Sequence, residues 1–87
     1  MWREHVYVRV ERRDLEDSLP IEDDVDLKGM KAYKLELLSS VDGNVDARGA
    51  EVKYFVAEGV EISGELDLRG ASICELYLKG ARIGELL

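Results

Sequence analysis

Three stretches of the chain, residues 25–44, 45–65 and 66–85, can be laid over one another almost residue for residue, with starts about twenty residues apart. A fixed period of this length is typical of a solenoid, in which each repeat buries its apolar face against the next. The sequence therefore predicts a stack of about three coils from this feature alone.

Each repeat divides into pentads, and the third reads LDLRG, ASICE, LYLKG and ARIGE. The first and third pentad positions are apolar throughout, except at Ser40 and Asp42, and the second repeat ends with one extra residue, Glu65. Residues two apart in an extended chain point the same way, so these two positions are expected to face a common interior. A period of five excludes an amphipathic helix, whose period is 3.6. Glycine at the fifth position can turn the chain at each corner: Gly29, Gly49, Gly59, Gly64, Gly70 and Gly80.

These pentads resemble the motif of the pentapeptide-repeat proteins, most closely in ASICE, LYLKG and ARIGE. Ala71 and Ala81 match the small inward residue of that family, and Leu78 and Ile83 match its central aliphatic residue. The resemblance covers residues 25–85 and implies a right-handed, four-sided parallel β-helix. Leu, Val, Met or Phe often replaces the small residue here, so the chain resembles a divergent member with a distorted or wider coil.

The first 24 residues have a different pattern. The run from His5 to Val10 alternates as HVYVRV, which predicts a strand with its valines on one face. A terminal coil exposes an unpaired edge and an open core, so we expect Trp2 and this strand to cover the amino-terminal end. We therefore divide one compact domain into a capping segment, 1–24, and an all-β, β-helical part, 25–87.

The other end carries no comparable segment, because the sequence given ends directly after a complete coil. One interpretation is that Leu86 and Leu87 fold back over the core. The other is that Ile83, Leu86 and Leu87 form the interface of an end-to-end homodimer with twofold symmetry, which the family resemblance also favours.

Two columns of charge are expected on the outside of the coils. Asp26, Asp46 and Asp67 occupy equivalent positions, and Lys28, Arg48 and Arg69 follow two residues later. Stacked carboxylates can bind a hard cation such as calcium. The adjacent cations neutralise the charge that such a site requires, so the pattern favours a surface ion-pair network over a metal site.

Tyrosines also occur at outward positions. Tyr33, Tyr54 and Tyr77, with Val56 beside Tyr77 in the stack and Leu38 nearby, predict a less polar side. Aromatic residues are enriched in interface cores, so this side is a candidate surface for an unidentified protein partner. The alternative is that the amino-terminal segment covers it.

We find no signature of an enzyme, a cofactor site or a metal site. His5 is the only histidine and Cys74 the only cysteine, and no histidine in the repeat of Cys74 could activate its thiol. A lone cysteine also excludes an internal disulfide. The sequence therefore indicates a non-enzymatic scaffold or protein-interaction module.

The net charge of −7 argues against direct binding to nucleic acid. Some pentapeptide-repeat proteins imitate DNA and occupy topoisomerases, which makes an acidic inhibitor the alternative function. Here the excess acid is concentrated near the capped end, in Glu16, Asp17, Glu22, Asp23 and Asp24, and not along the repeat.

Composition gives two further expectations. The chain has no Gln or Thr and one Asn but many charged residues, a bias common in thermophilic proteins. It has neither an apolar run of membrane-spanning length nor a secretory signal, which predicts a cytoplasmic protein without membrane contact.

Overall fold

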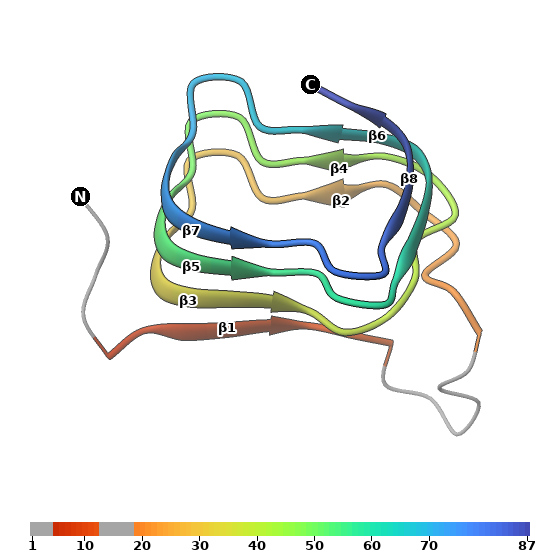
Figure 1. Ribbon diagram of the computed structural model, residues 1–87, viewed down its shortest axis with the longest axis horizontal. Coiled ribbons are helices and arrows are strands. Elements are labelled where there is room, and N and C mark those ends of the chain that lie inside the picture. The colour runs from red at the N-terminus through yellow and green to blue at the C-terminus, as the bar shows by residue number, and fades with distance from the viewer. Residues whose placement is uncertain (1–4, 13–18) are drawn as a thin grey trace.

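The structure, a computed structural model, describes residues 5–12 and 19–87. In these ranges the chain contains no helix, and its eight strands form two parallel four-stranded sheets (Figure 1). The prediction of an all-β fold with parallel strands is confirmed. Trp2, Glu16 and Asp17 lie outside the described residues. No described segment forms an apolar helix that could cross a membrane.

The chain alternates between the two sheets. Sheet A has the order β1 (Tyr7–Val10), β3 (Lys31–Leu37), β5 (Glu51–Val56) and β7 (Ser72–Tyr77). Sheet B has the order β2 (Val25–Asp26), β4 (Val45–Asp46), β6 (Glu61–Asp67) and β8 (Arg82–Leu86). We call one passage through both sheets a circuit, so that the last circuit consists of β7 and β8.

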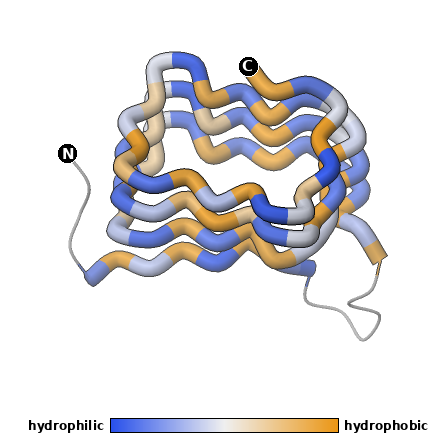
Figure 2. Tube along the Cα trace, in the orientation of Figure 1, coloured by the Kyte–Doolittle hydropathy of each residue, from blue (hydrophilic) through white to orange (hydrophobic). Residues whose placement is uncertain are grey.

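Equivalent residues of the three repeats stack directly on one another. Val25 pairs with Val45 and Val45 with Leu66, which are offsets of 20 and 21 residues. The first and third pentad positions are buried in the middle of the stack, and hydrophobic and hydrophilic residues alternate along each circuit (Figure 2). The buried inward residues at these positions are Leu27, Ala32, Leu35, Leu37, Val45, Ala47, Ala50, Val52, Phe55, Ala57, Val60, Ile62 and Leu66.

The two predicted polar exceptions do not interrupt the core. Glu36 pairs with Val56, an offset of 20, whereas Val41 bridges to Ile62, an offset of 21, so the first repeat is one residue shorter at this corner. Val41 therefore takes the inward position, with 1% of its surface exposed, and Asp42 points to solvent. The inward placement of Asp42 was wrong, because an ungapped pentad alignment cannot represent a shortened corner.

The extra residue of the second repeat corresponds to an irregularity in sheet B. Ile62 pairs with Ile83 at an offset of 21, but Glu65 pairs with Glu85 at an offset of 20. One additional residue therefore lies between Ile62 and Glu65, as in a β-bulge.

The amino-terminal strand begins later than the sequence predicts. His5 has a φ of 67°, outside the extended region, and the strand starts at Tyr7. β1 then pairs with β3 in parallel, and Val8 and Val10 are half-buried against the core. It covers the edge of sheet A, as expected, and it does so as a further strand of the same sheet.

Candidate interaction surface

The carboxyl-terminal end of the stack presents two open strand edges. β7 is the last strand of sheet A and β8 the last of sheet B, and no described strand pairs with their outer sides (Figure 1). Such edges carry a row of backbone N–H and C=O groups that can pair with another chain.

Apolar side chains of the last circuit are exposed beside these edges. Leu76 and Leu86 are 41% and 51% exposed, whereas Phe55 and Leu66, their neighbours one circuit below, are fully buried. Position in the stack causes this contrast, since the inward residues of the last circuit are covered on one side only. Other apolar residues of this circuit are half-buried: Leu68, Ala71, Ile73, Leu78, Ala81, Ile83 and Leu87.

The last two leucines continue sheet B and do not fold across the core. Leu86 pairs with Leu66, the backbone N–H of Leu87 donates to the Leu66 carbonyl, and the Leu87 carbonyl accepts from the Leu68 N–H. The structure thus contradicts the fold-back interpretation. Ile83 lies in β8 above Ile62, so the three predicted interface residues share this end of the molecule.

The tyrosines form a ladder on the outside of sheet A. The ring centroids of Tyr33 and Tyr54 are 5.4 Å apart in an edge-to-face contact, and Tyr7 joins at 5.7 Å from Tyr33. The Lys53 ammonium lies 5.6 Å and 5.5 Å from the Tyr33 and Tyr54 ring centroids. β1, the described part of the capping segment, therefore lengthens the tyrosine side through Tyr7 and leaves it open.

Tyr77 lies apart from this ladder. It pairs with Val56 across β5 and β7, as the sequence predicts, and is 40% exposed. Its hydroxyl donates to the Glu75 carboxylate on the same strand, and this hydrogen bond raises the pKa of Tyr77. The structure thus brings Tyr33 and Tyr54 into contact and places Val56 and Tyr77 as a second pair, nearer the open end.

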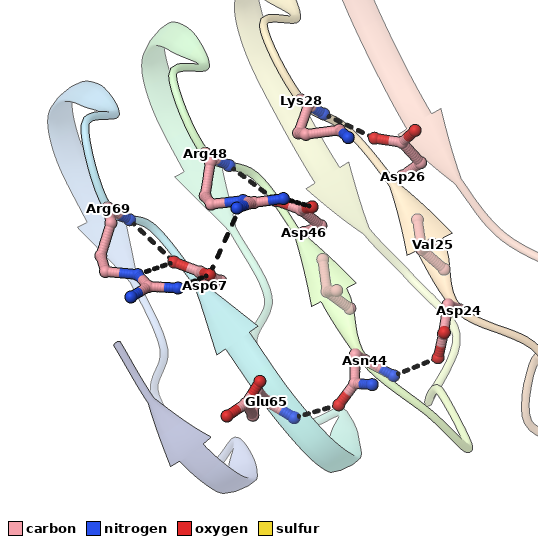
Figure 3. Close-up of a pocket in the computed structure, with 11 residues that line it drawn as sticks. Asp24, Val25, Asp26, Lys28, Asn44, Asp46, Arg48, Glu65, Asp67 and Arg69 are labelled. Carbon is pink, nitrogen blue, oxygen red and sulfur yellow. Dashed lines mark hydrogen bonds and ion pairs between the residues drawn. The ribbon is translucent and has the colours of Figure 1, made fainter.

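The Asp-x-Arg-Gly segments of sheet B build repeated corners (Figure 3). Asp46 and Asp67 each accept hydrogen bonds at one carboxylate oxygen from the backbone N–H and the Nε of the arginine two residues later, and Nη2 donates to the other oxygen. Arg48 also lies 3.8 Å from Asp67, which links successive circuits. The predicted ion-pair network is confirmed for these two circuits. Asp26 accepts only from the Lys28 backbone N–H, and no ion pair joins these two described residues.

The arginines lower the pKa of the carboxyls that they bind. The hydrogen bonds from the Arg69 guanidinium hold the pKa of Asp67 at about 2, below its ordinary value of 3.8. The side-chain hydrogen bonds from Arg48 lower the pKa of Asp46 in the same direction. Both carboxylates are therefore occupied by the corner and are poor ligands for a metal.

Asp67 should stabilise the fold in a pH-dependent way. Because its pKa is lower in the folded chain, its stabilising contribution is complete above the ordinary pKa and is lost as the pH falls from about 4 to about 2. We expect Asp67→Asn to be less stable than the native chain at pH 7 and the difference to shrink over this interval. Denaturant unfolding at several pH values measures it, with Asp42→Asn as an exposed control. A difference that stays constant down to pH 2 would contradict the assignment.

A second polar column lies beside the ion pairs and was not predicted. Asp24 Oδ1 accepts from the Asn44 backbone N–H at 2.9 Å, and Asn44 Oδ1 accepts from the Glu65 N–H at 2.8 Å (Figure 3). Each side chain thus bonds to the backbone of the next circuit. The only signal available from the sequence was the recurrence of Asp, Asn and Glu just before the valine or leucine that opens each repeat.

The described residues offer no catalytic or metal-binding arrangement. No group of three or more His, Cys, Asp or Glu side chains in the described ranges could hold a metal ion. His5 and Cys74 are both exposed and lie at opposite ends of sheet A, before β1 and within β7. A search against protein-family models, curated proteins and solved structures finds no match to this chain.

Proposed function

We propose that the chain is a non-enzymatic, self-associating scaffold or protein-interaction module built on a short right-handed parallel β-helix, a divergent relative of the pentapeptide-repeat proteins. The alternation of the chain between two parallel sheets supports this architecture. Right-handedness follows from the strong preference for right-handed connections between parallel strands of one sheet.

The observation that carries self-association is the open carboxyl-terminal end. Two strand edges and a layer of aliphatic side chains, including Leu76 and Leu86, meet there without cover from any described residue. A second copy can supply both the missing backbone partners and the missing apolar contacts. The tyrosine side, with Tyr33, Tyr54, Val56 and Tyr77, is the proposed surface for a different protein partner.

The acidic DNA-mimic function has less support. A mimic presents carboxylates along its length, but in sheet B Arg48 and Arg69 neutralise Asp46 and Asp67. The described acidic residues without such pairing, Asp23 and Asp24, lie near the amino-terminal end.

Light scattering on the 87-residue chain tests self-association. We expect a mass of twice 9.8 kDa for the native chain and a monomer for the double variant Leu86→Lys, Leu87→Lys, because two buried charges per chain would be costly at the interface. Leu38→Lys, at an exposed leucine of an inner circuit, is the matched control and should remain dimeric. A native chain that is monomeric at all concentrations would refute self-association.

A further inference from the structure

We infer that the two copies dock with β7 of one protomer antiparallel to β8 of its partner, and β8 antiparallel to the partner's β7. This inference rests on the proposed self-association and adds which strands meet and in what register. It follows from strand directions, the spacing of inward side chains and the positions of charges in the last circuit.

Strand directions limit the possible arrangements. The arrows of sheet A and sheet B run in opposite directions on two sides of the stack (Figure 1). A twofold axis that brings two identical ends together makes every new strand pair antiparallel. If the axis is perpendicular to the strands, β7 meets the partner's β7 and β8 meets the partner's β8. If it is parallel to the strands, β7 meets the partner's β8, which we call the crossed arrangement.

The inward side chains fix the register of each arrangement. β7 directs Ile73 and Leu76 toward the core, above Val52 and Phe55. β8 directs Ile83 and Leu86 inward, above Ile62 and Leu66. Both pairs are three residues apart, so the crossed arrangement places Ile73 opposite the partner's Leu86 and Leu76 opposite the partner's Ile83. A slip of one residue would place apolar side chains against polar ones, which sheets do not tolerate.

The outward charges favour the crossed arrangement. In this register Tyr77 lies opposite the partner's Arg82, and Glu75 lies diagonal to it on the same face. The Tyr77 hydroxyl already donates to Glu75, so both groups are positioned together. Among the described residues, no carboxylate lies within ion-pair distance of Arg82, which is exposed. The dimer would supply that partner twice.

The other arrangement brings like charges together. With β7 against the partner's β7, the two Glu75 side chains become diagonal neighbours across the axis, and the two Glu85 side chains do the same across β8. Like charges in neighbouring strands are destabilising. In the crossed arrangement the axis passes near the Lys79–Gly80 turn, where the two exposed Lys79 side chains are screened by solvent.

Head-to-tail stacking is also disfavoured by charge. It would continue the column of Glu65 and Glu85 into the partner's Asp24 and would pair β8 with a strand of only two residues, β2. The open end therefore fits a closed dimer better than a filament.

The native cysteine makes the register testable. Cys74 in β7 lies opposite the partner's Glu85 in the crossed arrangement, and directly opposed residues of antiparallel strands are close enough for a disulfide. We expect Glu85→Cys, under mild oxidation, to form a covalent dimer on the order of tenfold faster than either control. The controls are the native chain, which has Cys74 alone, and the double variant Glu85→Cys, Cys74→Ser.

Each other outcome overturns the inference in a recognisable way. Equally fast cross-linking of the native chain would place β7 against the partner's β7, and that of the double variant would place β8 against the partner's β8. A non-covalent dimer by light scattering that none of the three proteins cross-links would place the interface elsewhere. All three results leave self-association intact, whereas a monomer by light scattering would refute the proposed function itself.

Discussion

Replacing Phe55 with alanine is expected to lower the free energy of unfolding by about 3–5 kcal/mol. Phe55 is the largest fully buried side chain and lies in sheet A between Leu35 below and Leu76 above. Its removal leaves a cavity in the middle of the stack, where circuits on both sides hold the backbone in place and limit collapse. Urea unfolding of the native chain and the variant, followed by circular dichroism, measures the loss.

Leu76→Ala is the matched control for Phe55→Ala. Leu76 occupies the same column one circuit later, but 41% of its surface is exposed, so its truncation should cost only about 1 kcal/mol in the monomer. If Phe55→Ala does not fold, Phe55→Leu, which should cost about 1–2 kcal/mol, gives a measurable intermediate. Equal losses at positions 55 and 76 would show that the column is not packed as described.

Gly64→Ala is expected to destabilise the chain by about 3 kcal/mol. A β-carbon at Gly64 would overlap the Asn44 Oδ1 atom and lie 2.8 Å from the Gly43 carbonyl oxygen. Asn44 cannot simply rotate away, because its Oδ1 accepts the Glu65 N–H. The substitution must therefore break the Asn44 hydrogen bond or separate two circuits, and the same unfolding experiment measures the cost.

Gly29→Ala distinguishes steric overlap from backbone strain. Gly29 has a φ of +67°, but an added β-carbon would meet no atom within 4 Å. Alanine there should cost only about 1–2 kcal/mol, the usual cost of a left-handed conformation. A larger loss for Gly29→Ala than for Gly64→Ala would contradict the tight packing of the Gly43, Gly64 and Gly84 column.

The pentad pattern predicts most of the core, because direction in an extended chain depends only on local spacing. It fails where the number of residues per circuit changes. Val41 was assigned outward and Asp42 inward, since the shortened corner before Val41 leaves no mark in the apolar pattern. The bulge near Glu65 was detectable, because the following repeat regains its pattern after one extra residue.

The candidate surfaces were predictable where the repeat itself defines them. The Asp and Arg columns and the exposed end follow from the stacking of equivalent positions. Tyr7 was missed as a member of the tyrosine ladder, because its segment belongs to no repeat and its register against Tyr33 depends on the fold. The role of Asn44 was missed for a different reason, since its amide acts on the backbone of another circuit.

The amino-terminal strand shows that a stack of this kind can recruit sequence that lacks the repeat. β1 pairs with β3 at an offset of 27 residues, against 20 or 21 elsewhere. Closing the longer connection costs only about 0.3 kcal/mol more in chain entropy. Insertions or deletions between β1 and β2 should therefore be nearly neutral for folding, and the number of strands in such a protein can exceed the number that its repeats encode.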